Sequence, residues 1–571
     1  MRVPKPFAGS RRAGFARLCA IAAAQAGLAA GTAFVVKNAF DTVATKAPNF
    51  GTDWQPSQFG PLGILAGIAL FLAWLRRCEL IEAEKLGQSF THAVRLVLYD
   101  RLGSLTPRDL QKQSRGGHLL RFIGDLTALR QWISLGLARL IVASITAAFA
   151  LTALAFINLT LAATVAGVLA IGCVASLTQG KSLHIAVREA RRQRARLAGD
   201  VSERIAVMPV VQMFSQVRRE RGRIERRSGE LRDAMITRAR AVGSLRGLAE
   251  ATTGISLAAI LAAGAYEVGH GRASLGAVVA AMSVLGILTP ALRDLSRVYE
   301  YWQGYRVAIA RIREFANMRP SVKARSSAPA LPAGPGEIAF ENVVFADVLD
   351  GVTATAQAES IVAIVGPNAA GKSTLLSLVA RLIEPSSGDL LIDGNNLRQH
   401  SAVSIRASIG VVSPDLPLMR GTIGRNIRYR SPKASEAEVR HICALCGVDE
   451  ILANIPGGME ARVVEGGLNL SPGQRQRIVL ARAMLGGPSI LLLDEVDANM
   501  DPQSAGLMDN ILQTYPGTIL FVSHRPEQIA LADVIWHVAD GSIIEQGAPA
   551  DLLHRDGSTR RLLHRPLGLV A

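Results

Sequence analysis

A short glycine-rich segment in the second half of the chain has the composition of a phosphate-binding loop. Residues 366–374 read GPNAAGKST and stand between an apolar run, Ile361 to Val365, and a helical run, Leu375 to Leu382. A glycine-rich turn at a helix start points backbone N–H groups at one anion, a lysine adds positive charge, and a following hydroxyl suits Mg²⁺. We expect this loop to bind nucleotide phosphates through Gly366, Pro367, Asn368, Ala369, Ala370, Gly371, Lys372, Ser373 and Thr374.

Two adjacent carboxylates follow a second apolar run further along the chain. The run ILLLD ends in Asp494, and Glu495 comes next. A carboxylate at the end of a buried strand suits the ligand shell of Mg²⁺, and its neighbour is placed to polarise an attacking water. We therefore predict that Ser373 and Asp494 hold Mg²⁺ and that Glu495 is catalytic in the hydrolysis of ATP.

The segment between these two motifs resembles a known family. LSPGQRQRIVLARAML followed by ILLLDE is similar to the signature helix and the Walker B strand of ABC-transporter ATPases. This resemblance implies that His524, which follows the run ILFVS, is a catalytic switch histidine. It also implies that Ser471, Gly473 and Gln474 bind nucleotide and that Asp501 lies in a loop that contacts the partner.

In this family the signature of one subunit closes over the ATP held by the phosphate loop of another, so two nucleotide domains enclose two ATP molecules. The present chain carries one such domain. The resemblance therefore implies a second half-transporter as partner, which is either another copy of this chain or a different one.

Four positions depart from the pattern of the family. Ala369 adds a Cβ in a turn where glycine is usual because glycine visits positive φ freely. Pro472 replaces the first glycine of the signature and removes one backbone N–H. Pro414 stands where a glutamine normally faces Mg²⁺, and Asp347 stands where an aromatic ring normally meets adenine. We expect the nearby ring of Phe345 to lie in the core rather than against the base.

The composition of the first half indicates a membrane protein. Of the 571 residues, 49% are hydrophobic and 19% are charged. Runs of about 20 apolar residues are long enough to cross a hydrocarbon core as helices. We predict six spans, near residues 15–37, 59–77, 133–157, 158–178, 250–268 and 274–294. The third and fourth form one apolar stretch that is too long for a single crossing, so the chain must fold back near Asn158.

The predicted fold is a six-helix α transmembrane domain with long cytoplasmic helical extensions, followed by an α/β P-loop ATPase domain with a helical subdomain. The transmembrane domain covers residues 1–318, a linker rich in Pro, Ser and Gly covers residues 319–336, and the nucleotide-binding domain covers residues 337–571. The resemblance to exporters places coupling helices near Arg108 to Ser114 and near Pro209 to Gln216.

Basic residues near the span ends predict the orientation. Arg11, Arg12 and Arg17 lie at the start of the first span, and Arg76 and Arg77 follow the second. Cytoplasmic flanks of membrane helices carry an excess of such residues. We therefore expect a multi-pass protein of the bacterial inner (cell) membrane, with its N-terminus and its ATPase domain in the cytoplasm.

The net charge of +17 would also suit a nucleic-acid-binding protein. Much of the excess lies in the predicted cytoplasmic extensions, where attraction to anionic membrane lipids or a solvated helical face accounts for it. No nucleic acid is expected as a partner.

Two further patterns have structural interpretations. The segments GLAAG at residues 27–31 and GILAG at residues 63–67 contain small residues that allow close packing of membrane helices. His441, Cys443 and Cys446 stand close together in the sequence, but without a nearby fourth ligand we expect no metal site there.

Together these observations predict an exporter-type half-transporter that uses ATP and Mg²⁺ to export an amphipathic or lipidic substrate. A competing hypothesis is a weakly active or regulatory subunit that needs a different half-transporter for ATP turnover. Pro414, Pro472 and Asp347 motivate this second hypothesis. The sequence contains no feature that identifies the transported substrate.

Overall fold

The structure is a computed structural model that describes residues 3–9, 11–46, 60–111, 121–318, 320, 322, 328–496 and 502–563. The chain divides into two compact units. Unit 1 comprises residues 1–103 and 111–318, and unit 2 comprises residues 104–110 and 319–571. Asp501, part of the predicted linker and the end of the first predicted coupling helix lie outside the described residues.

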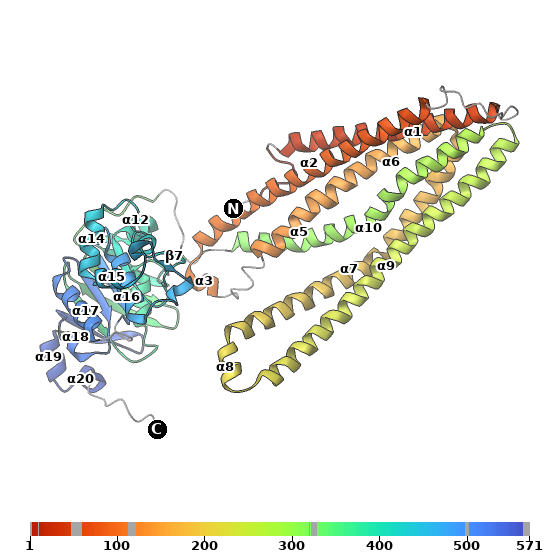
Figure 1. Cartoon of the computed structure of the whole chain (residues 1–571). Helices are drawn as coiled ribbons and strands as arrows, with labels where there is room; N and C mark the ends of the chain where they lie inside the picture. The colour runs from red at the N-terminus through yellow and green to blue at the C-terminus, as the bar shows by residue number, and fades with distance from the viewer. Residues whose placement is uncertain are drawn as a thin grey trace. The chain divides into compact units, whose positions relative to one another are not determined.

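Unit 1 is built of long helices joined by short connections (Figure 1). Its elements are α1 (Arg11–Lys46), α2 (Gly60–Ser104), η3 (Arg121–Asp125), α5 (Leu126–Gln131), η4 (Trp132–Leu137), α6 (Ala138–Ile157), α7 (Leu159–Ala206), α8 (Met208–Met213), α9 (Val217–Gly269) and α10 (Leu275–Asn317). The short helix α3 (Pro107–Gln111) follows α2.

Several of these helices are apolar enough to cross a membrane. In the described part of the chain, four have the required length and composition, and they cover Arg11–Thr42, Phe122–Ile157, Leu159–Gly180 and Val217–Gly269. A shorter apolar helix covers Leu275–Pro290. The predicted second span falls at the start of α2. The count of six spans stays a prediction.

The predicted fold-back at Asn158 is confirmed. α6 ends at Ile157, α7 begins at Leu159, and Asn158 between them has an extended backbone with φ −160° and ψ 120°. Its side-chain oxygen accepts a hydrogen bond of 3.0 Å from the N–H of Leu161. Asparagine is favoured at this N-cap position because it satisfies a backbone donor that the first turn leaves free.

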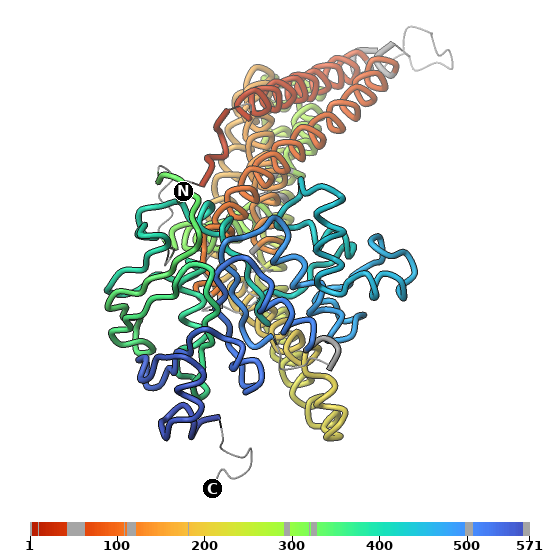
Figure 2. Tube along the Cα trace, turned by 90° about the vertical axis from the view of Figure 1, so that its left-hand side faces the viewer, coloured from red at the N-terminus to blue at the C-terminus, as the bar shows by residue number. Residues whose placement is uncertain are grey.

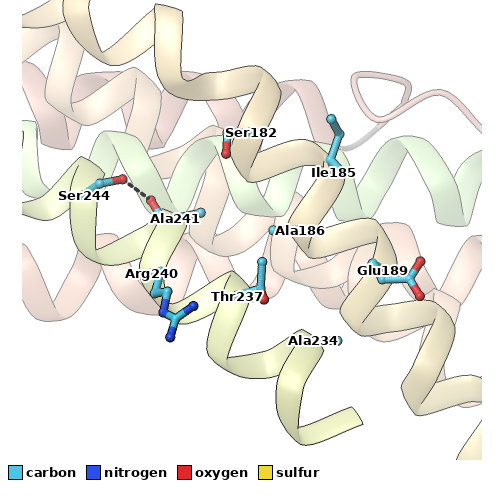
Figure 3. Close-up of a pocket in the computed structure, with 9 residues that line it drawn as sticks. All are labelled: Ser182, Ile185, Ala186, Glu189, Ala234, Thr237, Arg240, Ala241 and Ser244. Atoms are coloured by element: carbon cyan, nitrogen blue, oxygen red, sulfur yellow. Dashed lines mark hydrogen bonds between the residues drawn. The ribbon is translucent and has the colours of Figure 1, made fainter. Parts of the chain in front are cut away.

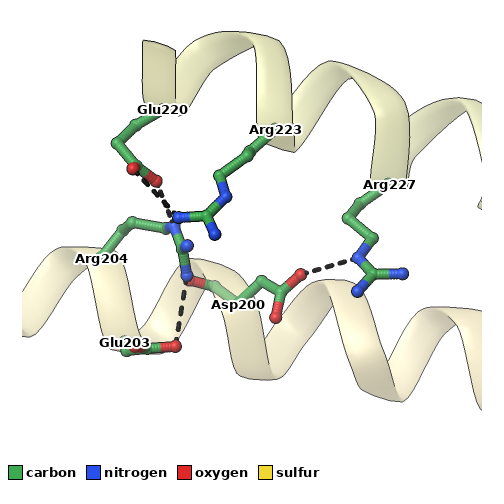
Figure 4. A network of polar contacts seen from close by, with 6 residues as sticks. All are labelled: Asp200, Glu203, Arg204, Glu220, Arg223 and Arg227. Carbon is green, nitrogen blue, oxygen red and sulfur yellow. Dashed lines mark hydrogen bonds and ion pairs between the residues drawn. The ribbon is translucent and has the colours of Figure 1, made fainter. Parts of the chain in front are cut away.

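α7 and α9 lie side by side as a long hairpin that α8 closes (Figures 1 and 2). Ion pairs join the two helices near the closed end, as Figure 4 shows. Arg204 of α7 donates from Nε to Glu220 of α9 at 2.7 Å, and Arg227 of α9 donates from Nε to Asp200 of α7 at 3.0 Å. Each pair joins a guanidinium of one helix to a carboxylate of the other.

The glycines of the two predicted small-residue patterns make no close contact with another described helix. They are Gly27, Gly31, Gly63 and Gly67. A Cβ added to any of these four would meet no described atom within 4 Å. Close packing of membrane helices at these glycines is therefore not seen among the described residues of this chain and stays a prediction.

α10 approaches α1 closely at Gly276. A Cβ at this position would lie 2.4 Å from the carbonyl oxygen of Lys37. The carboxylate of Asp41 accepts hydrogen bonds from the N–H of Gly276 and from the hydroxyl of Ser274, both at 3.0 Å. Asp41 of α1 therefore ties itself to the first turn of α10, where free backbone N–H groups favour a negative charge.

The described residues of unit 2 form an α/β assembly with three sheets. Its strands are β1 (Ile338–Phe345), β2 (Leu349–Ala356), β3 (Ile361–Val365), β4 (Ser387–Ile392), β5 (Asn395–Asn396), β6 (Ile409–Val412), β7 (Gly421–Thr422), β8 (Arg462–Val463), β9 (Ile490–Asp494), β10 (Thr518–Val522), β11 (Val534–Ala539) and β12 (Ser542–Gly547). A six-stranded sheet has the order β12-β11-β3-β10-β9-β6, and a four-stranded antiparallel sheet has the order β2-β1-β4-β5. β7 and β8 form a small third sheet.

Helices cover the six-stranded sheet and build a helical subdomain beside it. They are α11 (Lys372–Val379), α12 (Ala402–Ala407), α13 (Ile423–Ile427), α14 (Glu436–Leu445), α15 (Val448–Asn454), α16 (Pro472–Met484), α17 (Pro502–Thr514), α18 (Pro526–Ile529), α19 (Pro549–His554) and α20 (Ser558–Leu563).

Two apolar cores hold unit 2 together. One lies between the antiparallel sheet, α11 and one face of the parallel strands, and it contains Phe340 against the edge of Trp536 with ring centroids 5.8 Å apart. The other joins the opposite face of these strands to α14, α15, α16 and α17. The central parallel strands are thus buried on both faces, which explains their continuous apolar sequences, such as the four buried residues ILLL that precede Asp494 in β9.

Candidate functional site

The predicted phosphate loop, the two carboxylates and His524 lie at the carboxyl ends of parallel strands in the six-stranded sheet. The strands β3, β10, β9 and β6 are parallel neighbours, and their registers pair Val522 of β10 with Ile364 of β3 and with Asp494 of β9. The phosphate loop follows β3, His524 follows β10, the carboxylates end β9 and Pro414 follows β6. In open parallel sheets, ligands bind at this carboxyl edge.

The phosphate loop makes close backbone contacts that require its glycines. A Cβ on Gly366 would lie 2.0 Å from the carbonyl oxygen of Val538. Gly371, the residue before α11, has φ +105°, and a Cβ there would lie 2.6 Å from a side-chain carbon of Leu349. Ala369 has φ +66°, which confirms that this turn needs a left-handed residue. Alanine pays a steric cost in this conformation that glycine does not.

Lys372 is buried within the loop. Its Nζ donates hydrogen bonds to the carbonyl oxygens of Gly366 at 2.8 Å and of Pro367 at 2.9 Å. Burial lowers the pKa of Lys372, while the nearby carboxylates of Glu495 and Asp494 act in the opposite direction. The ammonium is therefore held within the loop, where its positive charge would suit a phosphate group.

The two predicted magnesium ligands are brought together across the sheet. The hydroxyl of Ser373 donates to Oδ1 of Asp494 at 3.0 Å. Burial raises the pKa of Asp494, and the hydrogen bond from Ser373 opposes this effect. A hydroxyl beside a carboxylate offers the hard oxygen donors that Mg²⁺ prefers, so these two residues fit the ion that the family pattern implies.

Glu495 and His524 lie exposed beside these groups. Glu495 has φ +49°, a left-handed conformation that is uncommon for a residue with a side chain. Strained backbone of this kind clusters at functional sites, where the surrounding structure holds it. His524 follows the buried Ser523, whose hydroxyl accepts a hydrogen bond from the N–H of Arg525 at 3.0 Å and so fixes the turn after β10.

The predicted signature residues form the N-terminus of α16. Ser471 is the N-cap: its hydroxyl accepts from the N–H of Gln474 at 3.2 Å, and its own N–H donates to Oε1 of Gln474 at 2.9 Å. Pro472 occupies the first helical position, where its fixed φ is favourable and no N–H is needed within the helix. The proline therefore stabilises the start of α16, while it removes one donor from the surface that Ser471 and Gly473 present.

Pro414 forms a tight turn after β6. The N–H of Leu416 donates to the carbonyl oxygen of Ser413 at 3.0 Å, which places Pro414 at the second position of the turn, where proline is favoured. This turn lines a cavity of about 250 Å³ together with Asp494, Glu495 and residues of α16. Gln476 and Arg475 are among those residues. They were not predicted from the sequence, although they directly follow the predicted nucleotide-binding residues in the signature helix.

A second cavity, of about 580 Å³, adjoins the phosphate loop. It is lined by Val344, Ala346, Asp347, Val348, Leu349, Asp350, Pro367, Asn368, Ala369, Ala370, Asp540 and Gly541. Phe345 does not reach it and is only 8% exposed in the core, which confirms the prediction for that ring. Asp347 thus stands in the cavity wall where the family pattern places an aromatic side chain.

The two cysteines of α14 and its C-terminus are part of the core. Cys443 and Cys446 are buried, and Sγ of Cys446 lies 3.8 Å from Sδ of Met484. Burial raises the pKa of Cys443 to about 11 and also raises that of Cys446. Both groups are therefore neutral thiols that pack as small apolar side chains.

Comparisons with known proteins agree with this geometry. The family model for the ABC transporter matches residues 349–498, and the model for the ABC transporter transmembrane region matches residues 17–292. A fatty acid ABC transporter ATP-binding/permease protein of Mycobacterium bovis is 30% identical over 78% of this chain and 71% of its own length. The chain belongs to the ABC transporter family. Because the chain contains the nucleotide domain of this family, it is an ATP-hydrolysing transporter.

Two further comparisons place this transporter among the exporters. An ATM1-type heavy metal exporter of Novosphingobium aromaticivorans is 32% identical over 61% of this chain and 58% of its own length. The structure of a bacterial Atm1-family ABC exporter with ATP bound is 26% identical, has a TM-score of 0.85, and is matched over 97% of this chain and 99% of that chain. The predicted fold, a helical transmembrane domain followed by an α/β nucleotide domain, is therefore confirmed, as is a multi-pass membrane protein.

The membrane unit of this transporter contains a groove of about 520 Å³ between α7 and α9 (Figure 3). Ala186, Ala234, Ala241 and Ile185 give it apolar walls, and hydroxyl groups and two charged side chains complete the lining. Those remaining residues are Ser182, Glu189, Thr237, Arg240 and Ser244. Glu189 accepts a hydrogen bond from Gln193 at 2.7 Å, so part of its bonding capacity is used within α7.

Proposed function

We propose that this chain is an exporter-type half-transporter that moves an amphipathic substrate across the bacterial inner membrane as a dimer. ATP binding closes two nucleotide domains, and hydrolysis at Glu495 opens them again. The observation that supports this proposal most is the hydrogen bond between Ser373 and Asp494, because it brings the phosphate loop next to the carboxylate at the end of β9.

The side chains divide the chemistry at the nucleotide. Lys372 and the N–H groups of the loop bind the phosphates, and Ser373 with Asp494 would hold Mg²⁺. When bound, this ion neutralises the charge on the phosphate oxygens. Glu495 orients and polarises the attacking water, and His524 stabilises the reacting phosphate from the neighbouring strand. Ser471, Gly473 and Gln474 act on the ATP held by the partner subunit.

The membrane side of the proposal rests on the predicted six spans. With basic residues at their cytoplasmic ends, an even number of spans returns the chain to the side where ATP is available. Residues 104–110, which include the start of the coupling helix predicted near Arg108 to Ser114, belong to the same compact unit as the nucleotide domain. This grouping supports a role for the segment in transmitting closure to the helices.

The groove between α7 and α9 supports an amphipathic substrate. Its apolar walls suit a hydrocarbon portion. The guanidinium of Arg240 makes no hydrogen bond or ion pair with any other described residue, so it is available for an anionic group. The names of the relatives include both fatty acid and heavy metal transport, and the apolar lining of the groove favours the first of these classes.

A direct test of the nucleotide chemistry uses the full chain reconstituted in lipid. The wild-type protein should hydrolyse ATP in the presence of Mg²⁺. Glu495→Gln should still bind ATP but lose about 100-fold or more in turnover, because it removes the group that activates water. Glu460→Gln, an exposed carboxylate in the same unit, serves as the control. Normal turnover of Glu495→Gln would reject this role.

A second candidate function is a subunit that depends on a different half-transporter for turnover. Pro414, Pro472 and Asp347 favour it, since each removes a group that the family pattern supplies at the site. The chain alone would then show almost no hydrolysis, and activity would appear when it is co-expressed with a half-transporter that has the usual glutamine and signature. Robust ATPase activity of the purified chain alone would exclude this candidate.

A further inference from the structure

One face of the signature helix α16 lines the cavity of about 250 Å³ that contains the carboxylates of its own chain. The residues of α16 at this cavity are spaced three and four positions apart, so they lie on one side of the helix. They are Pro472, Arg475, Gln476 and Val479. The same cavity is lined by Asp494, the last residue of β9, and by Glu495. The helix therefore faces the end of β9 with a defined set of side chains.

The two carboxylates have few hydrogen-bond donors. Oδ1 of Asp494 accepts a hydrogen bond from Ser373 at 3.0 Å. The other oxygen of Asp494 and the carboxylate of Glu495 accept no hydrogen bond from a described side chain. An ionised carboxylate can only accept, so a further donor would orient and stabilise it. Among the described residues that line the cavity, the side chains with N–H groups are those of Arg475 and Gln476.

These two side chains differ in where they are held. Nη1 of Arg475 donates to the carbonyl oxygen of Gly467 at 3.5 Å, and a Cβ on Gly467 would lie 3.0 Å from Cδ of Arg475. Arg475 therefore packs along Gly467. Gln476 is half-buried and makes no hydrogen bond with another described residue. Its amide provides two N–H donors and one carbonyl acceptor, so it is the group of this helix face that is available to the carboxylates.

The turn after β6, which lines the same cavity, supplies no amide. Pro414 has neither a polar side chain nor a backbone N–H, although the family pattern places a glutamine at this position. Gln476 offers the missing chemical groups from α16. Mg²⁺ held by Ser373 and Asp494 would keep several of its waters, and waters bound in this way donate hydrogen bonds. A carbonyl oxygen can accept from such a water while the N–H groups of the same amide donate to a carboxylate.

We propose that Gln476 is a positioning residue of the nucleotide site in its own chain, where its amide orients the carboxylates and the waters around Mg²⁺ in place of the glutamine that Pro414 replaces. The inference rests on the proposed function and adds a residue of the signature helix to the site of the same chain. Ser471 and Gly473, at the start of that helix, act on the ATP of the partner subunit. α16 then contributes to both sites of the dimer.

The experiment titrates Mg²⁺ into the full chain in lipid and measures the binding of labelled AMP-PNP, an ATP analogue that is not hydrolysed. Gln476→Ala should raise the Mg²⁺ concentration for half-maximal binding by about tenfold, because the loss of an outer-shell partner lowers metal affinity by about 10–100-fold. Val479→Ala shortens an apolar side chain on the same helix face and is the matched control, which should stay within about twofold of wild type. Equal Mg²⁺ dependence of Gln476→Ala and wild type would overturn the inference. Failure of the wild type to bind AMP-PNP would instead reject the proposed function.

A second substitution tests whether Gln476 takes the place of the residue at position 414. Pro414→Gln supplies an amide from the turn, so the double variant with Gln476→Ala should return to within about threefold of the wild-type Mg²⁺ dependence. Pro414→Gln alone should have little effect, because two amides that serve the same carboxylates do not act additively. A double variant that keeps the melting temperature of the wild type and the full loss of Gln476→Ala would show that the two amides are not equivalent, which overturns this part of the inference. The titration of Gln476→Ala remains decisive if the double variant does not fold.

Discussion

The hydroxyl of Ser373 and the carboxylate of Asp494 are 121 positions apart in the sequence and 3.0 Å apart in the fold. The sheet order explains this contact. β10 lies between β3 and β9, and the phosphate loop that follows β3 crosses over the end of β10 to reach Asp494. The contact places a hydroxyl, a carboxylate and the ammonium of Lys372 around one site, and it links the two motifs that the sequence separates.

Removal of the Ser373 hydroxyl should weaken this site. Ser373→Ala leaves Asp494 partly buried without its donor, and a hydrogen bond to a charged group is worth about 1.5–3 kcal/mol. We expect ATPase activity to fall by about tenfold or more and the Mg²⁺ concentration for half-maximal activity to rise. Ser377→Ala is the matched control, since that hydroxyl donates only to the backbone of α11. Equal Mg²⁺ dependence in both variants would argue against Ser373 as a ligand.

Replacement of Ala369 by glycine should stabilise the protein. Ala369 has φ +66°, and a left-handed conformation costs an L-residue about 1–2 kcal/mol relative to glycine. Glycine loses more backbone entropy on folding, which offsets about 0.5–1 kcal/mol of this gain. Ala369→Gly should therefore raise the melting temperature of the full chain by about 1–3 °C. Ala370→Gly changes a neighbouring residue whose φ is not positive, so it should lower the melting temperature. A lower melting temperature for Ala369→Gly than for Ala370→Gly would exclude strain at Ala369.

The sequence was most informative where function depends on short segments. The loop between β3 and α11 and the fold-back at Asn158 are each determined by a few neighbouring residues, so both could be predicted. The packing of the long helices could not, because it depends on which face of each helix meets another. Gly31 and Gly276 look alike in sequence, yet only Gly276 lies against a neighbouring helix.

These two glycines give a matched pair of substitutions. Gly276→Val should disrupt the contact of α10 with α1, since even a Cβ would lie 2.4 Å from the carbonyl oxygen of Lys37 and the same distance from Asp41. Overpacking of this kind costs about 1–3 kcal/mol. Gly31→Val adds the same atoms where no described atom lies within 4 Å. We expect only the first variant to melt at a clearly lower temperature in detergent. A similar loss in both would indicate that Gly31 packs against a partner.

Glu545 should make the stability of unit 2 depend on pH. Its carboxylate accepts hydrogen bonds from the N–H groups of Ser558 at 2.9 Å and Thr559 at 2.8 Å, at the first turn of α20. The hydroxyl of Thr559 also donates to this carboxylate and has the largest effect on it, and together with the two N–H groups it lowers the pKa of Glu545 to about 2. A carboxylate whose pKa is lower in the folded state stabilises the fold at pH values above its pKa in the unfolded state. This contribution is lost as the pH falls toward the pKa in the folded state.

Glu545→Gln tests this dependence. At pH 7 the variant should be less stable by about 1–2 kcal/mol, because neutral acceptors form weaker hydrogen bonds than charged ones. The difference in melting temperature from wild type should be constant above about pH 5.5 and should shrink as the pH falls below about 4.5 toward 3. His537, whose Nδ1 lies 3.7 Å from this carboxylate, has a pKa lowered by burial and stays neutral at pH 7. Glu460→Gln should show no such trend. A difference that stays constant down to pH 3 would exclude the carboxylate of Glu545 as its source.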